Sequence, residues 1–412
     1  MRSSPRAGAR DLRVVYVTGF YSEGMGYSEN CLPKAMATLG VEVHVIASDL
    51  QVYGNLPSYN DMYAGFLGPP CQPCGQRAIS GYVLHRLPHR LRFGYVDMVG
   101  LESLVRSLNP DIVHCFDCFS FPTLRMAFLR SVLGYKLFTE CHQHLSIVKP
   151  YLKDGHAFDL RRLGYHASRT LPGRLVSLAT ERCFAISPDC AEVARQFYGV
   201  EASKIRLVSL GTDTQHFVPL DGRQATTERM FLRENLGIAP GDIVCIYTGR
   251  FSQDKNPVVL AEAVSLLVKN GLPYRALFVG DGVQEKIIKS YSSSVVVPFV
   301  PHGELARYYR AADIGVWPTQ ESMSMLDAAS CGIPIVASDR IGEPDRVSGN
   351  GRLYCEGCTE DLARVLEQLR PAELRRELGR AARAKMLEKH SWLLVASDFR
   401  EEYLRATVRT KI

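Results

Sequence analysis

Two carboxylates, Glu321 and Asp327, lie six positions apart on either side of a polar turn. The apolar run 314–317 before this turn predicts a buried strand, and the pattern of 323–330 after it predicts a helix. Where a helix follows a strand through a short turn, its first N–H groups point outward and bind anions. The stretch therefore predicts an anion site with two acids beside it. A simpler alternative is a group of acidic capping residues at a helix start.

Two cations, Arg250 and Lys255, accompany another strand–helix junction. The apolar run 243–247 predicts the strand, Asn256 is a suitable N-cap, and Pro257 suits the first position of the next helix. Arg250 would then lie at the carboxyl end of the strand, and Lys255 just before the helix. Fixed cations in these places favour binding of a diphosphate, although two basic residues beside a surface loop are also common.

Short apolar runs alternate with helix-like segments throughout the second half, which is typical of a parallel, doubly wound sheet. The runs are 243–247, 276–279, 295–297, 314–317, 333–337 and a weaker 352–354. Ligands of such sheets bind in the crevice at the carboxyl ends of the strands. The two junctions described above both lie at such ends.

The first half opens with a strand, a glycine loop, a helix and a second strand, as in dinucleotide-binding units. These segments are 12–18, 23–27, 28–39 and 41–46. The loop contains Gly24 and Gly26 but lacks a third glycine, and Asp49 is a poor candidate for the acid that binds ribose in dehydrogenases. The pattern therefore argues against a nicotinamide-dependent dehydrogenase.

Three further segments of the first half carry side chains of interest. The predicted strand 135–139 is followed by His142 and His144, a pair that suits a metal, although no third ligand is apparent. The stretch 51–81 is rich in Pro, Gly, Tyr and Asn and indicates either a functional insertion or a disordered surface loop. The segment 149–174 is basic and aromatic, which suits either an anionic membrane surface or a solvated helix face.

Length and composition indicate two domains, because 412 residues with 46% hydrophobic side chains suffice for two cores. The net charge of +6 is too small to suggest a nucleic-acid-binding protein. No apolar run is long enough to span a membrane, and the run 14–17 is too short for a signal-peptide core. We therefore expect a cytoplasmic protein, at most peripheral at the cytosolic face of a membrane.

Twelve cysteines include three Cys-x-x-Cys pairs. The pairs are Cys71/Cys74, Cys115/Cys118 and Cys355/Cys358. Two such pairs would make a zinc site if they met in space. Free thiols in a reducing compartment are the simpler interpretation.

The sequence of 321–339 is Glu-Ser-Met-Ser-Met-Leu-Asp-Ala-Ala-Ser-Cys-Gly-Ile-Pro-Ile-Val-Ala-Ser-Asp, which resembles the signature of the glycogen-synthase-like retaining glycosyltransferases of family 4. Gly249-Arg250 with Lys255-Asn256 resembles a second signature of that family, in the right order. The resemblance covers nearly the whole chain and implies an α/β protein of the GT-B fold. That fold has two Rossmann-like domains facing across a cleft, with a C-terminal helix crossing back to the N-terminal domain. The polar stretch 221–227 predicts a linker at the boundary, and we place the domains at 1–221 together with helix 391–412, and at 222–390.

The resemblance also implies roles for individual residues. Arg250 and Lys255 would bind the leaving diphosphate. Glu321 would lie against the donor sugar, and Asp327 would hold ribose hydroxyls of the nucleotide. The other donor-binding residues that the resemblance implies are Ser322, Met323, Ser324, Gly24, Gly26 and Val300.

The chain departs from the family pattern in the spacing of its acids, which is six positions here and eight in the family. Either Thr319 takes the place of the first acid, or the turn is two residues shorter. We favour the shorter turn, because Glu-Ser-x-Ser resembles the Glu-Gly-x-Gly of the family. In the family, a histidine beyond the strand at 135–139 reaches the donor sugar, and we prefer His142 over His144 for this role.

The implied activity is retaining transfer of a sugar from a UDP- or GDP-sugar to a glycan or lipid-linked acceptor, in synthesis of cell-surface polysaccharide or glycoconjugates. The nucleotide sugar would be a co-substrate, no metal would be required, and no nucleic acid would bind. We also expect peripheral contact with an anionic membrane surface through 149–174. Two alternatives stay open: a GT-B epimerase or phosphorylase that does not transfer to an acceptor, and a catalytically inactive nucleotide-sugar-binding protein.

Overall fold

The computed structural model describes residues 12–92, 95–149, 160–220 and 222–408. The chain divides into two compact units. The first comprises the chain up to Glu23, residues 28–209 and the C-terminal part from Leu393, and the second comprises 24–27 and 210–392. The sequence prediction places the boundary between the two parts at 221/222.

The second unit is a six-stranded parallel sheet in the order β13-β12-β11-β14-β15-β16. The strands are β11 (Ile243–Thr248), β12 (Tyr274–Val279), β13 (Ser294–Val297), β14 (Ile314–Trp317), β15 (Ile335–Ser338) and β16 (Gly351–Tyr354). The order of a dinucleotide-binding sheet is 3-2-1-4-5-6, which is the order found here. All six strands predicted from the sequence are present, and the Rossmann-like prediction for this half is confirmed.

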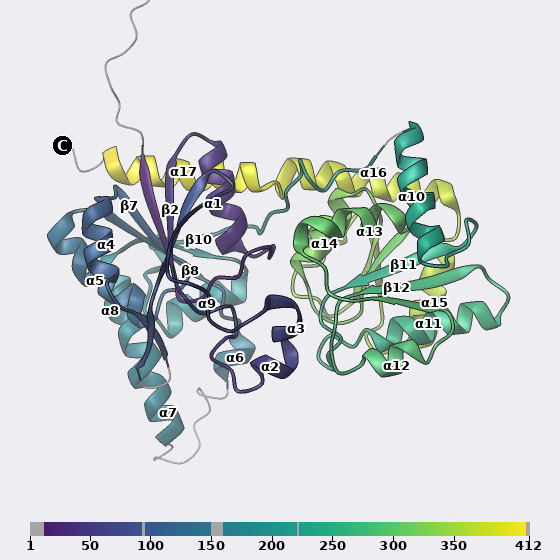
Figure 1. Ribbon diagram of the computed structural model, residues 1–412, viewed down its shortest axis with the longest axis horizontal. Coiled ribbons are helices and arrows are strands. Elements are labelled where there is room, and N and C mark those ends of the chain that lie inside the picture. Colours follow the sequence, from purple (N-terminus) through teal and green to yellow (C-terminus); the bar gives the residue numbers. More distant parts are fainter. Residues whose placement is uncertain (1–11, 93–94, 150–159, 221, 409–412) are drawn as a thin grey trace, which may run out of the picture. The chain divides into compact units, whose positions relative to one another are not determined.

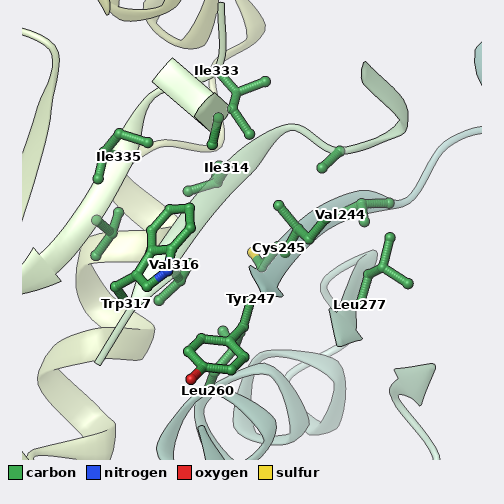
Figure 2. Packing of buried hydrophobic residues seen from close by; sticks show 14 of the residues in the cluster. Val244, Cys245, Tyr247, Leu260, Leu277, Ile314, Val316, Trp317, Ile333 and Ile335 are labelled. Atoms are coloured by element: carbon green, nitrogen blue, oxygen red, sulfur yellow. The ribbon is translucent and has the colours of Figure 1, made fainter. Parts of the chain in front are cut away.

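Helices cover both faces of this sheet. Figure 1 shows α11 (Val258–Lys269), α12 (Glu285–Lys289) and α15 (Thr359–Gln368) on one face, and α10 (Gly222–Asn235), α13 (Leu305–Ala311) and α14 (Met323–Ser330) on the other. The long α16 (Ala372–Lys389) packs against α14. Figure 2 shows how β11 and β14 contribute side chains such as Cys245, Tyr247, Val316 and Trp317 to the core around Leu260 of α11. Because the sheet is covered on both sides, every residue of β11 and β14 is buried.

The first unit contains an eight-stranded sheet in the order β10-β9-β8-β7-β1-β2-β4-β3, parallel except for the edge strand β3. The strands are β1 (Arg13–Thr18), β2 (Glu42–Ser48), β3 (Gly75–Ile79), β4 (Tyr82–Leu87), β7 (Ile112–Cys115), β8 (Lys136–Cys141), β9 (Thr180–Ala185) and β10 (Ile205–Leu207). The helices, with a small hairpin of β5 (His89–Arg92) and β6 (Tyr95–Met98), complete the unit. They are α1 (Ser28–Thr38), α2 (Tyr59–Met62), α3 (Ala64–Leu67), α4 (Leu101–Leu108), α5 (Phe121–Leu133), α6 (Leu145–Val148), α7 (Leu160–Tyr165), α8 (Leu171–Ala179) and α9 (Pro188–Gln196).

The last helix, α17 (Trp392–Val408), belongs to the first unit from Leu393 onward. Phe399 stacks on Phe184 of β9 at a ring distance of 4.0 Å, and Tyr403 meets Phe138 of β8 edge to face at 4.8 Å. Glu402, almost fully buried, pairs with Arg206 at 2.7 Å. The predicted return of the C-terminal helix to the first domain is therefore confirmed.

Three local predictions are wrong. Helix α10 begins at Gly222, so the stretch 222–227 is helical rather than a linker. The stretch 51–81 is more regular than expected, because it holds α2, α3 and β3. Asn256 is not the N-cap of α11: its φ is 44°, in the left-handed region, and the helix begins at Val258 after Pro257. Asparagine tolerates this conformation better than most residues, which explains its presence there.

Within the described residues, no helix combines the length and the apolar character that a bilayer crossing requires.

Glycines of the loops after β11 and β12 allow these loops to touch. The N–H of Phe251 donates to the carbonyl of Asp281 at 2.8 Å. A Cβ on Gly280 would lie 2.0 Å from the carbonyl oxygen of Gly249, and the φ of Gly280 is +151°. Only glycine fits this position, so the turn Gly280-Asp281-Gly282 fixes the path of the loop that carries Arg250.

We predict that Gly280→Ala destabilises the second unit by about 3–5 kcal/mol, because backbone strain and a backbone clash add. The matched control is Gly271→Ala, whose φ is +77° and whose Cβ would meet nothing within 4 Å. The control should lower the free energy of unfolding by only about 1–2 kcal/mol, which is the strain of a non-glycine residue in the left-handed region. Thermal unfolding of both variants checks this, and equal losses would contradict the role of close loop packing.

Candidate functional site

The predicted anion-binding residues lie at the point where the strand order of the second sheet reverses. β11 pairs with β12 on one side and with β14 on the other. The loop after β11 carries Arg250 and Lys255, and the turn after β14 carries Glu321. In open α/β sheets, the carboxyl ends of the strands at this reversal form the ligand-binding crevice. The fold therefore brings the two predicted junctions together.

Two hydrogen bonds join the loop after β11 to the turn after β14. The Nζ of Lys255 donates to Oε1 of Gln320 at 2.8 Å, and the hydroxyl of Thr319 donates to the carbonyl of Asp254 at 2.7 Å. We call these contacts the loop clasp. Because Thr319 has this structural contact and no carboxylate, the clasp favours Glu321 as the first acid and hence the shorter turn. Gln320 was not singled out from the sequence, since its role depends on the meeting of the two loops.

The charges around Lys255 leave its ammonium group poorly compensated. Burial lowers the pKa of Lys255, the neighbouring charge of Arg250 lowers it further, and the carboxylates of Asp254 and Glu321 oppose this shift. A lowered pKa means that the charged form is less favoured than in water. An anionic group bound beside Lys255 would restore the balance, as a phosphate does in many sites.

The carboxylate of Glu321 is held in place by the loop after β15. Its Oε1 accepts a hydrogen bond from the backbone N–H of Glu343 at 2.8 Å. A Cβ on Gly342 would lie 3.0 Å from the same oxygen, so a glycine there gives the carboxylate room. Glu321 is thus positioned through one oxygen.

The start of α14 is built around two serines. Ser322 is the N-cap, and its hydroxyl accepts from the N–H of Ser324 at 3.3 Å. The hydroxyl of Ser324 accepts from the indole N–H of Trp317 at 3.1 Å and donates to the carbonyl of Thr248 at 3.3 Å. These bonds fix the helix start, with half-buried Met323 as its first residue, to the ends of β14 and β11.

Asp327 is buried, with 3% of its surface exposed, and both of its oxygens have partners. Oδ1 accepts from the hydroxyl of Thr212 at 2.6 Å, and Oδ2 lies 2.8 Å from Nε2 of His302. A ribose hydroxyl would have to share or replace one of these partners, so the predicted ribose contact stays a prediction. The sequence offered no sign of the Thr212–Asp327–His302 arrangement, because its members come from three distant segments.

The remaining predicted donor residues have mixed surroundings. The side chain of Val300 packs against the hydrophobic core, so only its backbone is left for a ligand. Gly24 and Gly26 belong to the short stretch 24–27 that groups with the second unit. The carbonyl of Gly24 accepts from the N–H of His302 at 2.9 Å, and a Cβ on Gly26 would lie 2.5 Å from the His302 ring.

In the first unit, His142 lies beside the buried Glu140 at the end of β8. The two side chains form an ion pair, and Nε2 of His114 lies 2.9 Å from the other carboxylate oxygen. Burial alone would raise the pKa of Glu140, but His114 and His142 lower it to about 2. Burial lowers the pKa of His142, but the hydrogen bond to Glu140 and the charges of Glu140 and Glu29 together raise it, so that it lies above its ordinary value. The raised pKa means that the protonated, charged form of His142 is favoured.

Two more acids complete the surroundings of the paired histidines. Glu29, in the first turn of α1, interacts electrostatically with His142, and burial raises the pKa of Glu29. His144 instead points to Asp189, with Nδ1 3.0 Å from the carboxylate, and its side chain is half exposed. The two histidines thus have different partners. The ligand atoms of His144, Asp189 and Cys190 lie within 4.8 Å of one another. His144, without His142, therefore has two further metal-ligating side chains nearby that the sequence did not reveal.

The basic and aromatic segment 149–174 is described in part, because 150–159 lie outside the described residues. From Leu160 it forms α7, a π-helical turn (His166–Thr170) and the start of α8. The guanidinium of Arg169 lies over the rings of Tyr95, Phe119 and Tyr165 at about 5 Å. The guanidinium of Arg169 therefore makes cation–π contacts inside the protein and is not presented to a surface.

We predict that Glu140→Gln destabilises the first unit in a pH-dependent way. The pKa of Glu140 lies below its ordinary 4.5, so its stabilisation is present above that pH and is lost as pH falls toward 2. The pKa of His142 lies above its ordinary 6.5, so its part is present below that pH and is lost as pH rises. The gap in unfolding temperature between wild type and variant should be largest between pH 4.5 and 6.5. Glu181→Gln, at the partly exposed Arg130 pair, is the control, and a gap independent of pH would contradict the interpretation.

Comparison with known proteins gives two matching family models. Residues 242–370 match the model described as glycosyl transferases group 1, and residues 32–216 match the model described as glycosyltransferase family 4. Together the two models cover most of both units.

The curated relatives include glycosyltransferases of two kinds. The D-inositol 3-phosphate glycosyltransferase of Rhodococcus erythropolis is 30% identical over 261 residues, which are 59% of this chain and 58% of that protein. The enzyme of the same name from Actinosynnema mirum is 27% identical over 360 residues, 81% of each chain. The sulfoquinovosyl transferase of Arabidopsis thaliana is 26% identical over 50% of this chain and 41% of that protein. The match to the first two relatives spans less than two thirds of their own length, 58% and 56%.

Solved structures share the fold over nearly the whole chain. Sucrose-phosphate synthase from Thermosynechococcus elongatus has a TM-score of 0.69 at 18% identity, covering 97% of this chain and 100% of that one. HepE from Anabaena, in complex with UDP, has a TM-score of 0.68 at 15% identity, covering 95% and 99%. At such identities the likeness establishes the architecture alone. Taken with the two family models, it shows that the chain belongs to the family 4 glycosyltransferases of the GT-B fold.

Proposed function

We propose that the protein is a retaining glycosyltransferase that moves a sugar from a nucleoside-diphosphate sugar, with UDP or GDP as the nucleotide, to a glycan or lipid-linked acceptor. The observation that carries this proposal is the pair of cations, Arg250 and Lys255, at the strand-order reversal. Both residues lie in the loop after β11, and the charge of Arg250 lowers the pKa of the Lys255 ammonium group. A diphosphate is the ligand whose charge and size fit two fixed cations beside a helix start.

The difficult part of sugar transfer is departure of the diphosphate, which gains negative charge as the glycosidic bond breaks. Preorganised donors in a partly dehydrated site stabilise such charge more strongly than water does. Arg250, Lys255 and the first N–H groups of α14 are donors of this kind, and we propose that they act without a metal. Closure around the donor would also exclude water and limit hydrolysis.

Glu321 and His142 are the proposed contacts to the sugar. Glu321 has one carboxylate oxygen bound to a backbone N–H, which leaves the other to accept from a sugar hydroxyl or to steady positive charge on the ring. His142 is held in its charged form by Glu140 and would donate a hydrogen bond. Transfer with retention would follow if the acceptor attacks from the face on which the diphosphate leaves.

The names of similar proteins guide the choice of substrates to test. HepE was solved with UDP and with UDP-glucose, and the relatives are named for inositol 3-phosphate and sulfoquinovose transfer. UDP-sugars are therefore the first donors to try, and phosphorylated polyols and lipid-linked acceptors are the first acceptors. A role in cell-surface polysaccharide or glycoconjugate synthesis, and contact of 149–174 with an anionic membrane, are parts of the same proposal.

We predict that Lys255→Ala weakens binding of the matching nucleoside diphosphate by about 10- to 100-fold, because a charge-assisted hydrogen bond is lost. Calorimetric titration with UDP, GDP, ADP and CMP, without added metal, measures this. Lys269→Ala is the matched control, since Lys269 is an exposed lysine at the other end of α11. Equal binding by wild type and Lys255→Ala would remove Lys255 from the site.

We predict that Glu321→Gln lowers kcat by at least about 100-fold while binding of the diphosphate changes little, because the glutamine oxygen still accepts from Glu343 but the charge is lost. Initial rates with the donor found by calorimetry give kcat. Glu304→Gln is the control, because Glu304 is a half-exposed acid of the same unit. Turnover of the donor without any acceptor, retained in wild type, would favour the epimerase or phosphorylase alternative.

A further inference from the structure

A group of soft and acidic side chains gathers in the first unit, next to the end of β2. The ligand atoms of Asp49, Cys71 and His89 all lie within 4.8 Å of one another. Nδ1 of His89 lies 2.7 Å from Oδ1 of Asp49, and the same oxygen accepts from the N–H of His89 at 2.9 Å. Cys74, the partner of Cys71 in a Cys-x-x-Cys pair, follows three positions later. Its sulfur lies outside this group of three but interacts electrostatically with Asp49 and Cys71.

The topology of the sheet explains why these residues meet. β2 and β4 are parallel and end together, with Ser48 beside Leu87, so Asp49 and His89 both follow the same edge of the sheet. β3 runs antiparallel to β4, with Gly75 opposite Arg86. The start of β3 therefore lies at that same edge and brings Cys74 there.

Backbone hydrogen bonds hold the cysteine turn against the end of β2. The N–H of Gln72 donates to the carbonyl of Asp49 at 2.7 Å, and the N–H of Gln51 donates to the carbonyl of Pro70 at 2.8 Å. Leu50 and Cys71 form an antiparallel bridge. The position of Cys71 relative to Asp49 is thus set by the backbone and not by the side chains alone.

We propose that this cluster is a zinc site, with Cys71, Cys74, His89 and Asp49 as its ligands. Two thiolates and an imidazole are the donors that zinc prefers, and two residues between cysteines is the usual spacing of its ligands. A carboxylate completes a four-ligand site or orients the histidine, and either arrangement is common in zinc proteins. Both cysteines are exposed, so the ion has a route from solvent.

Nearby charge favours such a site. Arg86 of β4 is buried, and its guanidinium donates to the carbonyls of Ser48 and Tyr21 at 3.2 and 3.0 Å. Two thiolates and a carboxylate around Zn²⁺ would leave one negative charge in excess. Arg86, which interacts electrostatically with both Asp49 and Cys74, offsets that excess.

The site would act as a structural staple. The chain leaves the sheet at Asp49, makes the turn-rich excursion through α2 and α3, and returns at Cys74 to begin β3. An ion bound by Asp49, Cys71, Cys74 and His89 would close this excursion at its base. Closing a loop in the native state restricts its open conformations, so zinc should stabilise the segment 51–75 against local unfolding.

The chain offers a matched control in its other surface pair, Cys355 and Cys358. These cysteines have the same spacing, and one is exposed and the other half-buried. Among the described residues, neither belongs to a group of three metal-ligating side chains, whereas Cys71 of the other pair does. A double variant Cys355→Ser/Cys358→Ser therefore removes a Cys-x-x-Cys pair without touching the proposed site.

The test measures metal directly. Full-length reduced protein is loaded with Zn²⁺, desalted and assayed for zinc by mass spectrometry, and Co²⁺ is then substituted for spectroscopy. We expect one zinc per chain and a thiolate-to-cobalt charge-transfer band in wild type and in the Cys355/Cys358 control. Cys71→Ser/Cys74→Ser should lose the band, and His89→Gln should weaken zinc binding at least about 100-fold.

Limited proteolysis gives a second measurement that is independent of the variants. Removal of zinc from wild type by a chelator should speed cleavage within 51–75 and leave cleavage elsewhere unchanged. Absence of both zinc and the cobalt band in reduced wild type would overturn the proposal. So would a band that survives Cys71→Ser/Cys74→Ser, or a Cys71–Cys74 disulfide that persists under the reducing conditions of the assay.

Discussion

The partly compensated charge of Lys255 is the electrostatic feature around which the candidate site of the second unit is arranged. The ammonium group has lost part of its hydration, donates a hydrogen bond to Gln320, and is repelled by the like charge of Arg250. A partly buried cation beside a like charge is unfavourable in the free protein, so the fold must hold it there by other means. The loop clasp, made by the side chains of Lys255 and Thr319, and the backbone contact between the loops after β11 and β12 supply that restraint. Because the cation is already held in place, an anion that binds beside it would lose little free energy to rearrangement of the protein.

Asp327 shows how one side chain serves structure and function at once. Its carboxylate joins α14 to Thr212, from the segment that follows β10, and to His302, from the segment that follows β13. Because the group is buried, loss of either partner would leave an unsatisfied oxygen. The family resemblance assigns a ligand to this position, and the structure gives it two internal partners. The shorter side chain of aspartate fits this arrangement, since a carboxylate that is drawn into the interior reaches less far toward a nucleotide.

Much of the second unit could be predicted because its signals are local. Each strand is a short apolar run, and the junctions at Arg250 and Glu321 contain their own turn residues. The same reasoning failed where tertiary contacts decide. Asn256 looks like an N-cap but is held in a left-handed conformation by the loop that it ends, and helix α10 forms from a polar stretch because Arg229 and Arg233 pair with Asp313. The hydrogen-bond partners of Glu321 and Lys255 are Glu343 and Gln320, which come from other segments of the chain. Hydrophobic periodicity in the sequence does not reveal such partners.

The candidate site of the second unit could be predicted from the sequence more fully than the segment 51–75 of the first, for a physical reason. The cation pair rests on loops only a few residues long between regular elements, so the pattern of strands and helices already determines where it lies. The excursion at 51–75 has no such frame, because its two helices are only four residues long each and a chain of that length has much entropy to lose. Its base is nevertheless fixed by backbone bonds at Asp49 and Pro70. A ligated ion at that base would add a restraint on the segment that its short helices do not provide.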